Sequence, residues 1–126
     1  KSPKYYFSDV GLLAYLLGLE TPSQVSRDPL LGSIFENLVV LEVLKQRYNR
    51  GYDANLYFFR DSNGFEIDLL CSASSGLIGI EIKAASTWHS KFTKQLVRFA
   101  SNNQPLEQSV VVYNGVRALP FNDLSL

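Results

Sequence analysis

The chain has 126 residues, 46% of them hydrophobic, which suits the core of one compact domain and excludes a disordered chain. Lys and Arg number 12 and Asp and Glu also number 12, so the net charge is zero and contact with nucleic acid would need a local basic patch. The single cysteine, Cys71, excludes an internal disulfide bond, and no run of about 18 apolar residues predicts a membrane-spanning helix. No signal peptide is visible, and we expect a cytoplasmic domain that does not contact a membrane.

The first part of the chain, residues 1–31, predicts one helix and a connector. Residues 4–7 form a short aromatic run typical of a strand, and Ser8 or Asp9 can cap the helix that follows. This helix is apolar on most sides and is expected to end near Gly18. Residues 21–31 contain prolines and serines that predict a loop. Because the chain begins without methionine, we expect a fragment of a longer protein, in which residues 1–31 precede a core of residues 32–126.

The middle of the chain predicts a helix and then three strands. The helix is expected to run from Ser33 to Tyr48, with Ser33 as its cap and Glu36 in capping-box spacing. Residues 56–60, 64–70 and 79–83 predict strands; a turn at 61–64 and a hairpin at 72–76 join them.

The last part of the chain predicts a helix and a fourth strand. Residues 84–90 form a connector, residues 90–101 an amphipathic helix, and residues 110–113 a buried strand, with a short edge strand at 117–121. The order αβββαβ after an N-terminal helix predicts an α/β fold with a mixed central sheet flanked by helices.

Alternation along the two central strands brings charged side chains together. Apolar residues fill one face of each strand, namely Phe65, Ile67 and Leu69 in the first and Ile78, Ile80 and Ile82 in the second. Pairing of the strands would then bring Asp68, Glu81 and Lys83 to one face. Two carboxylates and an amine can hold a divalent cation and a water, and the alternative is a solvated strand face with a surface ion pair.

Asp68 on one strand, followed by Glu81-x-Lys83 on the next, resembles the signature of the PD-(D/E)XK nuclease superfamily. Ile67 stands in place of the usual proline. Four motifs in order, at residues 6–12, 32–37, 59–68 and 80–83, are similar to the C-terminal domain of a prokaryotic AAA+-type ATPase family. The trailing domain of that family is regarded as nuclease-like and is functionally uncharacterised. The resemblance covers nearly the whole chain and implies a restriction-endonuclease-like core and an upstream ATPase region as a partner.

The same resemblance implies roles for individual residues. Mg²⁺ or Mn²⁺ would lie on Asp68 and Glu81, Glu36 of the preceding helix would complete the metal site, and Lys83 would act on the attacking water. For Glu36 the alternative is a carboxylate that stabilises its helix N-terminus. Gln95 matches the Gln-x-x-x-Tyr element of RecB-type nucleases, with phenylalanine in place of the tyrosine, and is expected to bind substrate. An exposed helix glutamine is its alternative.

Other residues offer weaker candidates. Basic side chains on the helices predict either phosphate contacts or a solvated surface, and Trp88 and His89 predict either base stacking or loop packing. One histidine argues against zinc, and the chain lacks a P-loop, so we expect no ATP binding by this chain. Two functional hypotheses remain: metal-dependent cleavage of DNA, or an inactive module of the same fold that recognises DNA or protein for the ATPase. The sequence predicts no oligomeric state.

Overall fold

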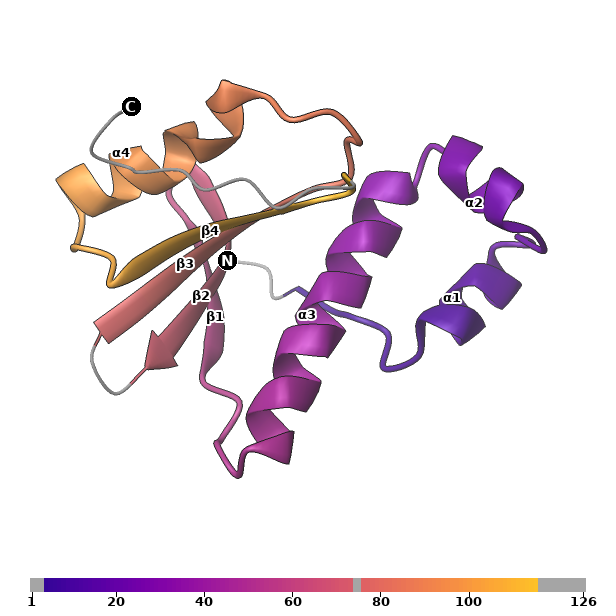
Figure 1. Ribbon diagram of the computed structural model, residues 1–126, viewed down its shortest axis with the longest axis horizontal. Coiled ribbons are helices and arrows are strands. Elements are labelled where there is room, and N and C mark those ends of the chain that lie inside the picture. The colour runs from indigo at the N-terminus through magenta and orange to yellow at the C-terminus, as the bar shows by residue number, and fades with distance from the viewer. Residues whose placement is uncertain (1–3, 74–75, 116–126) are drawn as a thin grey trace.

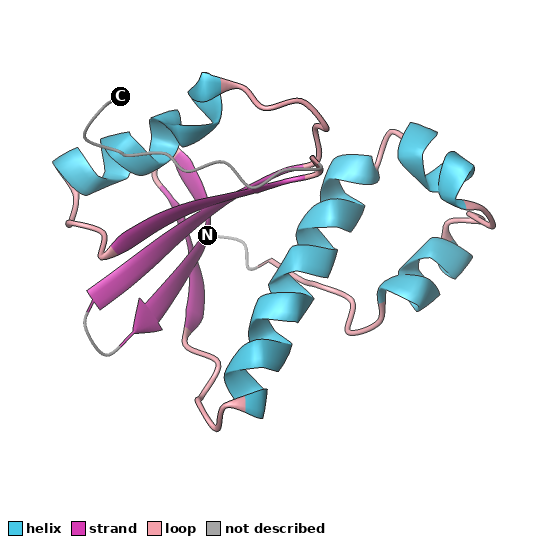
Figure 2. Ribbon diagram, viewed as in Figure 1, coloured by secondary structure: helices cyan, strands magenta, loops and turns pink. Residues whose placement is uncertain are grey.

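Four strands form one mixed sheet in the order β1-β2-β3-β4. They are β1 (Leu56–Arg60), β2 (Glu66–Ala73), β3 (Gly76–Lys83) and β4 (Gln108–Tyr113) in the computed structural model, which describes residues 4–73 and 76–115. The first three strands are an antiparallel meander, and β4 pairs with β3 in parallel. Helices cover both faces of the sheet (Figures 1 and 2), so the expected α/β fold is confirmed.

The connections of the meander follow local sequence signals. Asp61 Oδ1 accepts hydrogen bonds from the backbone N–H groups of Asn63 and Phe65, each at 2.9 Å, and Gly64 takes a φ of 82°. Such a backbone favours glycine, and the turn predicted at residues 61–64 is confirmed. The β2–β3 connection is shorter than predicted, because Ala73 already pairs with Gly76. Residues 74–75 of the predicted linker lie outside the described residues.

A helical crossover joins the parallel strands β3 and β4. It consists of a 3-10 turn, η1 (Ser90–Thr93), and helix α4 (Lys94–Asn102), which confirms the helix predicted there. Trp88 packs edge-on against Phe92 and Tyr113, with ring centroids 5.6 and 5.5 Å apart. β4 is the last strand of the described sheet, and its side chains are mostly half-buried rather than fully buried as predicted. The edge strand predicted at residues 117–121 lies outside the described residues.

Three helices precede the sheet. They are α1 (Val10–Leu16), α2 (Pro22–Arg27) and α3 (Leu31–Asn49). Asp9 caps α1 as predicted, accepting the N–H of Leu12. The loop predicted at residues 21–31 is wrong, because Thr21 and Gln24 form a capping box and Pro22 lies in the first turn of α2, where its missing N–H costs nothing.

Two further predictions for this region are wrong. Helix α3 is capped at Leu30 without a side-chain bond, so Ser33 lies inside the helix and Glu36 is free of the predicted capping box. Residues 4–7 form no strand; the segment crosses α3 on its way to α1 (Figure 1).

The core has two parts, one on each face of the sheet. The α3 face buries Val39 and Val40 against Leu69, Ile80 and Ile82. The α4 face buries Leu96 and Phe99 against Phe65, Ile67 and Leu70. Each face therefore has its own helix, and the ends of β2 and β3 lie between them.

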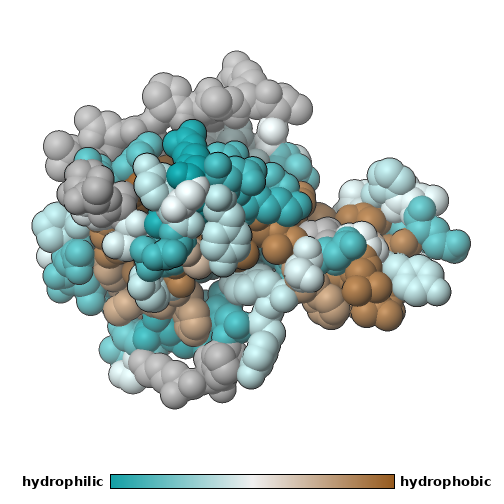
Figure 3. Space-filling view, turned by 90° about the horizontal axis from the view of Figure 1, so that it is seen from below, coloured by the Kyte–Doolittle hydropathy of each residue, from teal (hydrophilic) through white to brown (hydrophobic). Residues whose placement is uncertain are grey.

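Helices α1 and α2 extend away from the sheet beyond α3 (Figure 1). Three large side chains of α1 are exposed, those of Leu12, Tyr15 and Leu16. Figure 3 shows a group of hydrophobic residues on this part of the surface. None of the helices among the described residues has the length and apolar character needed to cross a membrane.

Candidate functional site

A β-bulge in β2 shapes the centre of the candidate site. Tyr57 of β1 lies opposite Leu70 of β2, whereas Phe59 lies opposite Ile67, so Asp68 and Leu69 together face a single residue of β1. The extra residue reverses the alternation along β2. Ile67 therefore packs on the α4 face and Leu69 on the α3 face, which corrects the prediction that they share one face.

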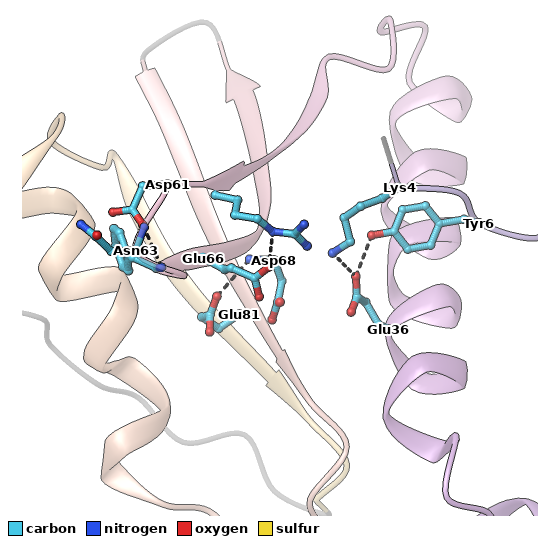
Figure 4. A network of polar contacts seen from close by, with 10 residues as sticks. Lys4, Tyr6, Glu36, Asp61, Asn63, Glu66, Asp68 and Glu81 are labelled. Carbon is cyan, nitrogen blue, oxygen red and sulfur yellow. Dashed lines mark hydrogen bonds and ion pairs between the residues drawn. The ribbon is translucent and has the colours of Figure 1, made fainter. Parts of the chain in front are cut away.

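Side chains replace the backbone pairing of β2 and β3 next to the bulge. The recorded pairing of the two strands ends at Leu69 and Ile80. Beyond it, the N–H of Asp68 donates to Glu81 Oε1 at 3.0 Å, and the N–H of Ile82 donates to Asp68 Oδ2 at 2.8 Å. Each carboxylate thus binds the main chain of the neighbouring strand, and Figure 4 shows the two acids close together.

The two acids reach this position from different faces. Asp68 lines a cavity on the α3 side together with Leu69 and Val40. Glu81 alternates with Ile80 and Ile82, whose side chains pack on the α3 face, so it leaves β3 on the other side. Asp68 and Glu81 therefore do not share one face of the sheet as expected. Asp68 lies on the α3 face and Glu81 on the α4 face, and the two side chains meet at the opening between β2 and β3.

Burial makes the ionised form of both acids costly. Glu81 is 3% exposed, and burial followed by the negative charge of Asp68 raises its pKa to about 7. Burial also raises the pKa of Asp68, more than the Ile82 N–H lowers it. Acids in this state are stabilised by a proton or a cation.

Lys83 provides a positive charge beside the pair. Its Nζ lies 3.7 Å from Glu81 Oε2, and its side chain is 39% exposed. The ammonium group lowers the pKa of both Asp68 and Glu81 without outweighing burial. It is therefore close enough to act on a charged group bound at the site.

Glu36 of α3 faces this region but has partners of its own. Its Oε2 accepts hydrogen bonds from Lys4 Nζ at 2.8 Å and from Tyr6 Oη at 2.6 Å (Figure 4). Burial and then the hydrogen bond to Glu36 raise the pKa of Tyr6 to about 12. Burial lowers the pKa of Lys4, but Glu36 outweighs it, so the pKa is raised overall. The predicted cap interaction of Glu36 is absent from the described bonds of α3.

Sequence reasoning missed Lys4 and Tyr6. In an extended segment, residues two apart point to the same side, and here Lys4 and Tyr6 are half-buried while Tyr5 and Phe7 are exposed. The sequence Lys4-Tyr5-Tyr6-Phe7 shows no matching alternation of polar and apolar residues, so it carries no signal for this arrangement. It does not reveal that the partner is an acid 30 residues further along the chain.

Among the described residues, Gln95 has no hydrogen bond to Asp68 or Glu81. It is half-buried on α4, and among the described residues it makes no hydrogen bond with Lys83. Phe99, which stands where the Gln-x-x-x-Tyr element of RecB-type nucleases has its tyrosine, is buried. It packs on Phe59 with ring centroids 5.1 Å apart. Substrate contact by Gln95 stays a prediction.

Several weaker candidates have structural partners. Arg47 donates to the Asp53 carbonyl at 2.7 Å and to Cys71 Sγ at 3.0 Å. Arg98 lies over the ring of Phe65. These contacts favour structural roles for both arginines.

The donor set fits a divalent cation by its chemistry. In the described part of the chain no group of three or more His, Cys, Asp or Glu side chains is arranged to hold a metal. Mg²⁺, however, is commonly held by one or two carboxylates with water and substrate phosphate. Asp68 and Glu81 supply such oxygens, each with one oxygen bound to a backbone N–H.

Comparison with known proteins identifies a family and distant relatives. Residues 31–126 match the family described as Domain of unknown function (DUF4143). Uncharacterized protein Rv2008c of Mycobacterium tuberculosis and Uncharacterized protein Mb2031c of Mycobacterium bovis are each 32% identical over 123 residues. The alignment covers 98% of this chain and 26% of each relative, so the chain spans about a quarter of their length. No solved structure matches the chain.

Proposed function

The chain belongs to the DUF4143 family, and we propose that it is a nuclease-like domain that binds Mg²⁺ or Mn²⁺ and hydrolyses phosphodiester bonds in DNA. One observation carries the proposal: Asp68 and Glu81 are held against each other by main-chain N–H groups although burial disfavours their charge. A fold gains no stability from two such acids by themselves. A bound cation would stabilise them, and the resemblance to the PD-(D/E)XK signature supports the same residues.

Asp68 and Glu81 would hold the cation through the oxygens that are not bound to the main chain. A bound divalent cation polarises a phosphate group and lowers the pKa of a water molecule. The backbone N–H groups of Asp68 and Ile82 fix the acids in position before any ligand arrives, which reduces the ordering cost of binding. Lys83 would stabilise the negative charge that develops on the phosphate.

We further propose that the domain acts as part of a larger protein. The resemblance implies an upstream AAA+-type ATPase region, and the mycobacterial relatives extend well beyond the aligned segment. Because the net charge of the chain is zero, few of its side chains would contact DNA phosphates. The DNA affinity would then change little with salt concentration. We expect weak DNA binding by this domain alone.

A second candidate is a module that binds cation and DNA without cutting. The contacts of Glu36 favour it, because Lys4 and Tyr6 engage the carboxylate that the resemblance assigns as a third ligand. Only two acids are then left for a metal. Cleavage and binding therefore have to be measured separately.

The test is Mn²⁺ titration followed by thermal unfolding and plasmid nicking. A ligand that binds only the folded state at a hundredfold excess over its Kd stabilises by about 2.7 kcal/mol. We expect this shift in the unmodified protein and its loss in Asp68→Asn and Glu81→Gln. The matched control is Glu42→Gln, which changes an exposed acid of α3.

Nicking by the unmodified protein separates the two candidates, and Lys83→Gln tests the role of Lys83 in cleavage. A cleaving site should retain Mn²⁺ binding in this variant and lose nicking, because Lys83 acts on the phosphate rather than on the cation. Mn²⁺ binding without nicking in the unmodified protein would favour the non-cutting module. The absence of Mn²⁺ binding and nicking would refute both.

A further inference from the structure

The segment of residues 4–7, here called the N-terminal strap, is fastened to helix α3 by four hydrogen bonds. Asn37, which is 4% exposed, uses its amide to bind both main-chain groups of Phe7, with the N–H at 2.7 Å and the carbonyl at 2.8 Å. The side chains of Lys4 and Tyr6 bind the same oxygen of Glu36. A backbone clamp and a side-chain clamp therefore hold the strap at adjacent residues of one helix.

The strap brings a positive charge to the candidate site. Lys4 and Asp68 line the same cavity, of about 490 Å³, between α3 and the sheet. The Lys4 ammonium lies 5.2 Å from the centre of the Phe58 ring, which forms part of the cavity wall. Its charge also acts on Asp68, as does the opposite charge of Glu36. Lys4 thus interacts with the acids of both α3 and β2.

We propose that Lys4 is an internal counter-cation that occupies the place of a divalent ion beside Glu36 and Asp68, and that the strap withholds Glu36 from the metal until Lys4 is displaced. The inference rests on the proposed function, because it concerns the same site. Tyr6 and Asn37 are positioning residues, since they hold the ammonium group in place through Glu36 and the backbone of Phe7.

The contacts are suited to a reversible device. The side chains of Lys4 and Glu36 are 25% and 23% exposed, so solvent reaches the ion pair and limits its strength. A divalent ion carries twice the charge of the ammonium group and takes carboxylate oxygens as ligands. Competition between them is then decided by the concentration of the ion and by contacts that stabilise or release the strap.

The experiment measures Mn²⁺ affinity by calorimetry in the whole chain and in Lys4→Gln, Lys4→Arg and Tyr6→Phe. We expect about tenfold tighter binding in Lys4→Gln, which corresponds to about 1.4 kcal/mol. Lys4→Arg should keep the affinity of the unmodified protein, because the charge is retained. Tyr6→Phe should show a smaller gain, and it provides a second test if Lys4→Gln folds poorly. Lys45→Gln is the control, since Lys45 pairs with Glu42 on the exposed side of α3.

A double variant with Glu36→Gln identifies the carboxylate involved. The gain from Lys4→Gln should vanish in that background, because the released ligand is no longer an acid. A gain that persists without Glu36, or no gain in either Lys4→Gln or Tyr6→Phe, would overturn the counter-cation role.

The two proposals fail in different ways. If the unmodified protein binds Mn²⁺ through Asp68 and Lys4→Gln changes nothing, the metal site stands and the strap is refuted. If only Lys4→Gln binds Mn²⁺, the strap stands as a full block of the site, and the proposal that the unmodified domain binds the ion is refuted. If neither binds Mn²⁺, both are refuted.

Discussion

Replacement of Glu81 by glutamine should stabilise the protein at high pH and have little effect at low pH. Burial and Asp68 raise the pKa of Glu81 from about 4.5 in the unfolded chain to about 7 in the folded protein. The folded protein therefore binds the extra proton between these values, and stability falls as pH rises through this window. Glutamine has no proton to lose and keeps an oxygen that can accept the Asp68 N–H.

The size of the effect follows from the two pKa values. Each tenfold change in proton affinity corresponds to about 1.4 kcal/mol, so ionised Glu81 costs the fold about 3 kcal/mol above pH 7. We expect Glu81→Gln to be about 3 kcal/mol more stable than the unmodified protein at pH 8.5 in EDTA. At pH 4.5 the two should agree to within about 0.5 kcal/mol.

Urea unfolding at the two pH values, followed by circular dichroism, measures the difference. Glu42→Gln, an exposed acid with a side-chain exposure of 58%, should show no comparable dependence on pH. Saturating Mn²⁺ at pH 8.5 should reverse the order of stability, because only the unmodified protein keeps both proposed ligands. The same stability difference at both pH values would refute this reasoning, because it would show that ionisation of Glu81 does not destabilise the folded protein.

Three further predictions test contacts away from the acid pair. Asn37→Leu should cost about 2 kcal/mol in urea unfolding and speed hydrogen exchange at Phe7, because two backbone groups lose their partner. Tyr6→Phe should cost about 1.5 kcal/mol through the lost bond to Glu36, whereas Tyr15→Phe on the exposed side of α1 should cost nothing measurable. Gly64→Ala should destabilise by about 1 kcal/mol because its φ is 82°, while Gly32→Ala should stabilise by about 0.5 kcal/mol because it lies in α3 with open space around it.

The parts of the fold that depend on neighbours in sequence were predictable. Alternation marked the strands of the meander, and residues 61–64 carried turn chemistry that the structure confirms. Helix α2 was missed because Thr21 and Pro22 were interpreted as loop residues, although together with Gln24 they form a capping box and a helical first turn. The same residue types serve both purposes, and only their spacing distinguishes them.

The centre of the candidate site was predictable in its residues and not in its geometry. The Asp68, Glu81 and Lys83 pattern identified the strands, but the bulge depends on how β1 pairs with β2. That register is set by residues on another strand and by the two helices that cover the sheet. The contact of Lys4 with Glu36 spans 32 residues, so no local pattern specifies it.

The charges around the acid pair favour joint binding of a cation and a phosphodiester. Among the described residues of the site, three carboxylates, those of Glu36, Asp68 and Glu81, face two ammonium groups, those of Lys4 and Lys83. One negative charge is left over, in agreement with the raised pKa of Glu81, because a proton would neutralise it. While Lys4 remains paired with Glu36, a divalent cation in place of that proton leaves one positive charge, and the single negative charge of a phosphodiester balances it. Since charges buried without a partner are costly, Mn²⁺ affinity should increase when a non-cleavable phosphodiester is present.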